Sequence, residues 1–162
     1  MLAKAPVVHS ISGIGIVISL IPFTALLVLN AWLVPDYFPI LGAALWLATL
    51  PLCRSLLTGA HRRGVRLVKQ GRFREAIPVF EEALADIARR PWIDKYRWLL
   101  LGSASRWGYR EMALCNLAYC HGQVGDGDRM REIYGKVLAE FPNNMLAISA
   151  LRMIDAVSGK SG

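Results

Sequence analysis

The first third of the chain is almost free of charged side chains. Residues 11–57 contain only two, Asp36 and Arg54, although the whole chain has 19 basic and 12 acidic residues. Two mainly apolar runs, 11–34 and 38–57, lie on either side of the turn sequence VPDYFP. A helix needs about 20 apolar residues to cross a bilayer, and the two prolines end a helix and favour a tight turn. The stretch therefore predicts a transmembrane hairpin of two antiparallel helices over residues 1–57.

Two other interpretations of this stretch are weaker. The hydrophobic core of a signal peptide is about 7–15 residues long, whereas the first run has 24 residues without a charge and no convincing cleavage site at its end. A buried soluble hairpin with two such runs would need a large protein around it. Both runs are therefore expected to lie in lipid.

Basic residues flank the predicted hairpin, and its turn has none. They are Lys4 before the first span and Arg54, Arg62, Arg63, Arg66 and Lys69 at or after the end of the second. By the positive-inside rule both termini face the cytoplasm, so we expect an integral membrane protein, typical of the bacterial inner membrane. The residues expected at the membrane interface are Trp32, Tyr37, Phe38 and Arg54.

The net charge of +7 does not indicate a nucleic-acid partner, because acidic residues accompany the basic ones and no nucleic-acid-binding motif is present. The three cysteines, Cys53, Cys115 and Cys120, lack CxxC spacing, which argues against a disulfide framework and fits a reducing compartment. No group of His, Cys and acidic residues has metal-ligand spacing. No nucleophile motif or phosphate-binding loop is found either. The sequence predicts no metal, no cofactor and no enzymatic activity.

The remainder of the chain is organised around residues 61–84, HRRGVRLVKQGRFREAIPVFEEAL. Gly64, Leu67 and Val68 recur at helical spacing, and Gly71 follows as a residue that accepts a left-handed backbone. A second apolar face then continues at steps of three and four through Phe73, Ala76, Ile77, Phe80, Ala83, Leu84 and Ile87. The stretch predicts two short helices packed against each other around a turn at Gly71.

This pattern resembles the tetratricopeptide repeat (TPR), a family built from antiparallel helix pairs. The family has a small residue at the helix crossing, a glycine and an aromatic residue at the turn, and an Ala–aromatic–Ala series on the second helix. The matching residues are Gly64, Gly71, Phe73, Ala76, Phe80 and Ala83. The first helix departs from the pattern, with Ala60 at the early aromatic position and Arg63 where leucine is usual.

A second, more divergent match follows. Its turn glycine is Gly125, 54 residues after Gly71, whereas regular repeats are about 34 residues apart. The other matching positions are Leu114, Leu117, Ala118, Tyr134 and Leu138, and FPNN at 141–144 resembles a repeat end. Met130 and Val137 stand where alanine is usual.

Taken together, these features predict an all-α protein. The transmembrane hairpin of 1–57 precedes a short TPR-like α-solenoid of 58–157, with repeats at about 58–90 and 111–144 and an inserted helix at 91–110. An amphipathic helix at 145–157 is expected to cap the open apolar face, and 158–162 is expected to be a disordered tail.

The inserted residues 91–110 leave two interpretations open. Trp92, Tyr96, Leu99 and Leu100 share one helical face. That face either packs onto the repeats or rests on the bilayer surface with its aromatic rings at headgroup depth. The first interpretation is favoured because the repeats alone form a small core.

The resemblance implies a concave groove, lined by the first helix of each repeat, that binds a peptide or a partner helix. Carried over by position, its residues are Thr58, His61, Arg62, Val65, Lys69, Met112, Cys115, Asn116, Tyr119 and Gln123. The part from the first repeat is basic, so the expected ligand is an acidic segment of a membrane-associated protein. The predicted role is that of a scaffold or assembly factor for a membrane complex, close to the cytoplasmic membrane surface.

An alternative role is that of an accessory subunit of a membrane transporter or enzyme complex, bound mainly through the two transmembrane helices. In both cases a protein partner and the lipid bilayer are the expected contacts. A homo-oligomer is a further expectation, because two repeats are fewer than the roughly three that usually form a stable array.

Overall fold

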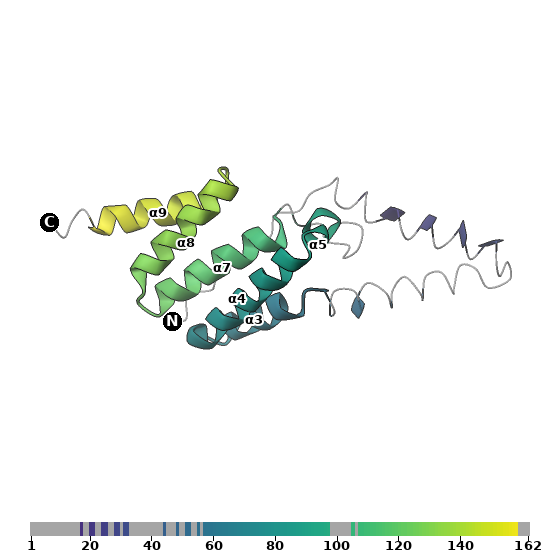
Figure 1. Cartoon of the computed structure of the whole chain (residues 1–162), viewed down its shortest axis with the longest axis horizontal. Helices are drawn as coiled ribbons and strands as arrows, with labels where there is room; N and C mark the ends of the chain where they lie inside the picture. Colours follow the sequence, from purple (N-terminus) through teal and green to yellow (C-terminus); the bar gives the residue numbers. More distant parts are fainter. Residues whose placement is uncertain are drawn as a thin grey trace. The chain divides into compact units, whose positions relative to one another are not determined.

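The computed structural model describes residues 57–97, 105 and 107–158, together with the isolated positions 17, 20, 21, 24, 25, 28, 29, 31, 32, 44, 48, 51, 52 and 55. Among these residues six helices have defined bounds and no β-strand occurs, which confirms the predicted all-α class. The helices are α3 (Gly59–Lys69), α4 (Phe73–Arg89), α5 (Trp92–Lys95), α7 (Tyr109–Gln123), α8 (Gly127–Glu140) and α9 (Met145–Ser158) (Figure 1).

The described residues divide between two compact units. The first unit contains residues 60–89 and 109–158, and therefore α4, α7, α8, α9 and all of α3 except its first residue. The described residues up to 59 and those of 90–108, which include α5, belong to the second unit. Nearly all of the predicted insertion, 91–110, thus lies in a different unit from the two helix pairs that it joins in sequence.

No helix in the described part of the chain is long and apolar enough to cross a membrane. The predicted localisation, an integral protein of the bacterial inner membrane with both termini in the cytoplasm, is wrong on this finding. A span needs about 20 apolar residues in one helix, whereas α4, the longest helix with defined bounds, has 17 residues and carries charged side chains on its exposed face.

Most positions of the predicted spans, 11–34 and 38–57, lie outside the described residues. The same holds for Tyr37, Phe38 and Arg54 of the predicted membrane interface and for residues 159–162 of the predicted tail. The fourth interface residue, Trp32, is described, and its side chain is exposed.

Helices α3 and α4 pack against each other through short apolar faces. Their buried positions recur at steps of three and four, as expected for amphipathic helices; they are Ala60, His61, Gly64 and Val68 on α3 and Ala76, Phe80, Ala83 and Ile87 on α4. Phe80 is fully buried, and a Cβ atom added at Gly64 would lie 2.7 Å from its ring. The absence of a side chain at Gly64 is therefore what allows the two helices to approach.

The turns after α3 and α7 have the same backbone structure. Gly71 and Gly125 adopt φ values of 74° and 86°, in the left-handed region that glycine tolerates best. After α3, the amide of Arg72 donates to the carbonyl of Leu67 and the amide of Gly71 donates to that of Val68, both at 3.0 Å. After α7, Asp126 and Gly125 donate to His121 and Gly122 in the same pattern, at 2.9 and 3.2 Å. Both helices therefore end in a Schellman motif.

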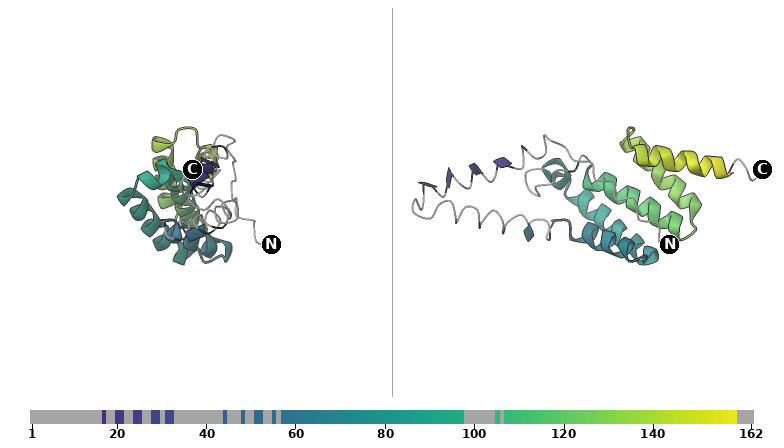
Figure 2. Two further views of the ribbon diagram at one scale, coloured as in Figure 1. Left: turned by 90° about the vertical axis from the view of Figure 1, so that its right-hand side faces the viewer. Right: turned by 180° about the vertical axis from the view of Figure 1, so that it is seen from behind.

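Helices α7, α8 and α9 continue the stack of the first unit. Helix α7 packs against α4 on one side and α8 on the other, and α9 packs against α8, as Figures 1 and 2 show. Tyr134 is buried on α8, the helix that follows the second glycine turn. Because α7 has helices on two sides, seven of its 15 residues are buried, including Ala113, Leu117 and Ala118.

Helix α5 is the helix that the structure describes within the predicted insertion. Ile93 is almost fully buried, whereas Trp92 and Tyr96 are 43% and 47% exposed. Leu99 and Leu100 lie outside the described residues. The buried contact of α5 therefore comes from Ile93, and not from the Trp92–Tyr96 face that the sequence pattern favours for packing.

Candidate functional site

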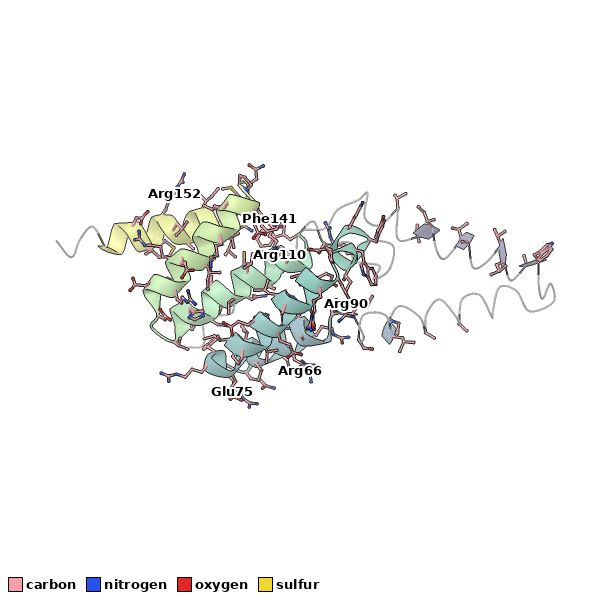
Figure 3. The ribbon with its side chains drawn as sticks, in the orientation of Figure 1. Arg66, Glu75, Arg90, Arg110, Phe141 and Arg152 are labelled. Atoms are coloured by element: carbon pink, nitrogen blue, oxygen red, sulfur yellow. The ribbon has the colours of Figure 1, made fainter. Side chains whose placement is uncertain are left out.

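Three basic residues form a continuous stripe on the outer face of α3. Arg62, Arg66 and Lys69 follow one another at steps of four and three residues, and all are exposed. At about 100° of rotation per residue, they lie within roughly 60° of one another and opposite the buried face of Gly64. Figure 3 shows Arg66 projecting outward from α3. We call Arg62, Arg66 and Lys69 the basic stripe.

None of the basic-stripe residues forms a hydrogen bond or an ion pair with another described residue. Arg63, on the same helix, differs: its guanidinium donates to both carboxylate oxygens of Glu82 on α4 at 2.8 Å. Similar pairs join the other neighbouring helices, with Arg110 at 2.6 Å from Glu140 and Arg131 at 2.7 Å from Asp155. The stripe is therefore a group of three positive charges that no ion pair within the described part of the chain neutralises.

Several acidic side chains elsewhere on the surface are bound to basic ones. The hydrogen bond from Arg72 lowers the pKa of Glu75 below its ordinary value. Hydrogen bonds from Lys136 and then Arg129 lower the pKa of Glu132 to about 2. These carboxylates stay ionised at neutral pH and neutralise their basic neighbours, so the first unit is not uniformly positive.

Helix α7 exposes one narrow stripe of uncharged side chains. Its members are Met112, Asn116, Tyr119 and Gln123. They follow at steps of four, three and four, and again lie within roughly 60° around the helix. The Tyr119 ring packs edge-on against Phe73, with ring centroids 5.8 Å apart. We call these four residues the α7 stripe.

Ring contacts link α7 to the start of α3 and to the start of α4. The ring of His61, near the start of α3, packs edge-on against that of Tyr109, the first residue of α7, at 5.5 Å. Phe73, just after the α3 turn, contacts Tyr119 further along α7. Val65, which is half-buried, lies between His61 and Lys69 around α3. Helix α7 is therefore held against both members of the first helix pair.

The structure separates the ten predicted groove residues into two groups. Thr58, His61 and Cys115 are buried; His61 is enclosed by the rings of Phe80 and Tyr109, at 5.8 and 5.5 Å. The partly or fully exposed residues are Arg62, Val65, Lys69, Met112, Asn116, Tyr119 and Gln123. Only this second group can meet a ligand without rearrangement.

Arg66 belongs to the basic stripe but was absent from the predicted groove. The positions that the TPR resemblance carries over skip it, although its spacing of four residues from Arg62 and three from Lys69 is visible in the sequence. Charge periodicity on α3 was therefore the signal that could have identified it.

The buried polar residues of the first unit form a structural contact. The Asn144 side chain is 2% exposed; its Nδ2 donates to Glu111 Oε1 at 2.8 Å and to Cys115 Sγ at 3.5 Å. Its Oδ1 accepts the amide of Ala147 at 2.8 Å, which caps the N-terminus of α9. One side chain thus joins α7 to the first turn of α9.

The described thiols are not suited to nucleophilic chemistry. Burial, followed by the charge of Glu111, raises the pKa of Cys115 to about 12. Burial also raises the pKa of Cys120 to about 12. A thiol with such a pKa stays protonated at neutral pH, whereas reactive cysteines have lowered values.

No group of three or more His, Cys, Asp or Glu side chains within the described ranges could hold a metal ion. His121 lies on α7 with its Nδ1 3.1 Å from Asp126 Oδ2. Asp126 also accepts the amide of Arg129 at 3.2 Å and so caps α8. This pair therefore has a structural explanation as a link between α7 and the start of α8.

Comparisons with known proteins add no assignment, since no protein-family model, no curated protein and no solved structure matches the chain.

Proposed function

We propose that the first unit is a TPR-like protein-interaction module that binds an acidic segment of a partner protein and acts as a scaffold or assembly factor. The observation that carries the proposal is the basic stripe, whose three charges form no ion pair with another described residue. Charge complementarity to this stripe supports an acidic ligand.

The TPR-like part of the proposal is supported by two features of the helix pairs. The first is the contact between Gly64 and Phe80, which puts a small residue of α3 against an aromatic residue of α4. The second is the repeated Schellman turn at Gly71 and Gly125. These are the crossing and turn positions that the resemblance in sequence rests on.

An acidic protein segment fits the stripe better than a nucleic acid does. Arg62 and Lys69 are seven residue steps apart on the helix, so the stripe is about 10 Å long. A nucleic-acid site usually extends as a basic surface over much of a domain. Here Arg110 and Arg131, on the other helices of the unit, are paired with acidic residues. The unpaired charge of α3 is therefore short, and suits two or three carboxylates.

A binding measurement tests the proposal. The probe is a fluorescently labelled 15-residue peptide rich in glutamate, titrated with the full chain and followed by anisotropy. We expect the double variant Arg62→Glu/Lys69→Glu to bind at least about tenfold more weakly, because each reversal replaces an attraction by a repulsion. Raising the salt concentration should also weaken binding to the unchanged chain.

The matched control is Arg74→Glu/Arg152→Glu, which changes the net charge equally at two exposed residues outside the stripe. Binding within about threefold of the unchanged chain is expected for the control. Equal weakening by both double variants would mean that only net charge matters, and would contradict the proposed site. Absence of binding to the unchanged chain would contradict the proposed function.

A further inference from the structure

We infer that two copies of the chain associate through an exposed apolar face of the second unit, packed antiparallel across a twofold axis. The face has Thr24 and Ala25 at its centre, flanked by six large hydrophobic residues, Val17, Leu20, Ile21, Val28, Leu29 and Trp32. We call these eight residues the apolar face. It belongs to a different unit from the basic stripe, so the inference does not depend on the proposed function.

The apolar face is one side of a helix that the rest of the chain leaves uncovered. All eight positions are helical, and together they line one open groove. The six large side chains are between 48% and 83% exposed. Among the described residues of the first unit, by contrast, the exposed large hydrophobic residues are Met145 and Met153. Exposed apolar surface is therefore concentrated in the second unit.

The area of the apolar face fits a dimer. Five partly exposed aliphatic side chains and Trp32 offer about 600 Å² of apolar surface. This is the upper end of the range for the largest apolar patch on a monomeric protein. Two copies would bury about 1,200 Å² between them, which reaches the size of a specific interface.

The apolar face is complementary to itself when two copies run antiparallel. With the twofold axis between positions 24 and 25, Leu20 of one copy meets Leu29 of the other, and Ile21 meets Val28. Each of these contacts then occurs twice, as a twofold interface requires. All four residues are aliphatic, so both pairs place apolar surface against apolar surface.

The two ends of the apolar face differ in size, which favours the antiparallel arrangement. Trp32 is the largest side chain of the face and Val17 is a small one. The antiparallel pair puts Trp32 of each copy against Val17 of the other. A parallel pair would put tryptophan against tryptophan at one end and valine against valine at the other, so the helices would separate at one end.

The centre of the apolar face suits close packing of two helices. Thr24 and Ala25 are small, and the distance between packed helix axes depends on the side chains at the contact. The Thr24 hydroxyl donates to the carbonyl of Leu20 at 3.0 Å. Burial of Thr24 in the dimer therefore leaves no hydroxyl donor unpaired.

A second copy fits the apolar face better than a different protein does. None of the eight residues is charged, so two identical faces meet without repulsion between like charges. Charged groups are what usually selects one foreign partner over another, and this face offers none. Its sizes along the helix, large at one end, small at the centre and smaller at the other end, are matched by its own reversed copy.

The experiment is sedimentation equilibrium of the full chain in buffer without detergent or lipid. We expect a monomer–dimer equilibrium. Ile21→Glu and Val28→Lys should each raise the dissociation constant at least about tenfold, because each puts a charge into an apolar contact. In the double variant Ile21→Glu/Val28→Lys, the introduced glutamate of one copy faces the introduced lysine of the other. This variant should associate at least about fivefold more tightly than either single variant.

The double variant also excludes a folding defect as the cause, because it carries both substitutions and is expected to recover. Circular dichroism of each single variant should show unchanged helicity. The control is Met153→Glu, at a position of α9 that is 70% exposed and outside the apolar face. Its dissociation constant should stay within about twofold of that of the unchanged chain.

Three results would overturn the inference. One is a chain that stays monomeric at about 100 μM, far above the dissociation constants of most specific complexes. Another is a double variant no tighter than the single ones, since Ile21 and Val28 would then not face each other. The third is a monomer that instead binds phosphatidylcholine vesicles and loses this binding in Ile21→Glu, which would make lipid the occupant of the apolar face.

Discussion

Gly64 lies against the ring of Phe80 where α3 crosses α4. An added methyl group would be 2.7 Å from a ring carbon of a fully buried side chain, so the helices would have to separate or the ring would have to turn. We therefore expect Gly64→Ala to lower the free energy of unfolding by about 1–3 kcal/mol, as overpacking of a core usually does. Chemical denaturation at neutral pH measures the change.

Gly135 is the matched control for this substitution. It lies inside α8 with no atom within 4 Å of its added Cβ. Gly135→Ala should raise the free energy of unfolding by about 0.5–1 kcal/mol, because alanine favours the helix over glycine. A Gly64→Ala protein as stable as the Gly135→Ala protein would show that α3 and α4 do not cross at Gly64.

The buried thiol of Cys120 predicts a loss of stability at alkaline pH. Burial raises its pKa from an ordinary value of 9.0 to about 12, so below pH 9 the thiol is neutral in both the folded and the unfolded chain. Between about pH 9 and 12 the unfolded chain loses this proton and the folded chain keeps it. The free energy of unfolding should therefore fall with rising pH, by up to about 1.4 kcal/mol per pH unit for this group.

Denaturation curves between pH 8 and 10.5 test this expectation. Cys120→Ala removes the titrating group and should make the fall shallower, although Cys115, whose pKa is raised in the same way, still contributes. Comparison at pH 7 separates the packing cost of the substitution from its effect on titration. Identical pH slopes for the variant and the unchanged chain would contradict the assignment.

At the scale of elements, Asn144 determines how α9 begins. Its side chain caps α9 through the amide of Ala147 and reaches Glu111 on α7. We expect Asn144→Ala to cost about 1–3 kcal/mol, since it removes the cap and leaves the Glu111 carboxylate without this donor. Amide hydrogen exchange should accelerate first in α9.

Asn143→Ala is the control for this prediction, because Asn143 is adjacent in sequence and exposed. Its effect on stability should stay within about 0.5 kcal/mol. If the two alanine variants accelerate exchange in α9 equally, Asn144 is not the residue that fixes this helix.

The helix pairs could be predicted from the sequence because the residues that indicate them lie close together in the chain. Gly71 and Gly125 mark their turns through the backbone conformation that glycine tolerates. The burial of His61 could not be predicted from the sequence, because it depends on contacts with Phe80 and Tyr109. Tyr109 is 48 residues away in sequence. The same limit applies to Asn144, whose partner Glu111 is 33 residues distant.

At the scale of the whole molecule, local sequence patterns predicted the structure less well than at the scale of single helices. The predicted membrane localisation came from counting apolar residues between 11 and 57, whereas a span also requires one continuous apolar helix, and the described residues contain none. The insertion 91–110 was expected to belong to the repeat domain, but its described residues up to Gly108 belong to the second unit. Their assignment depends on contacts between distant parts of the chain, which no sequence window contains.

The candidate site could be predicted only in part from the sequence. The resemblance supplied its positions on α3 and α7, and seven of the ten are exposed or half-exposed in the structure. Which charges remain unpaired could not be deduced from sequence, because Arg62 and Arg63 are neighbours and only Arg63 reaches an acidic residue of α4. The basic stripe is defined by that difference.

The central claim is that an acidic ligand contacts the basic stripe of α3. Titration of the isotopically labelled full chain with the glutamate-rich 15-residue peptide, followed by NMR, locates the contact directly. We expect the largest shifts at the side-chain signals of Arg62 and Arg66, with little change at Arg129 and Arg152. Shifts centred on Arg129 or Arg152, with the signals of α3 unmoved, would contradict the central claim.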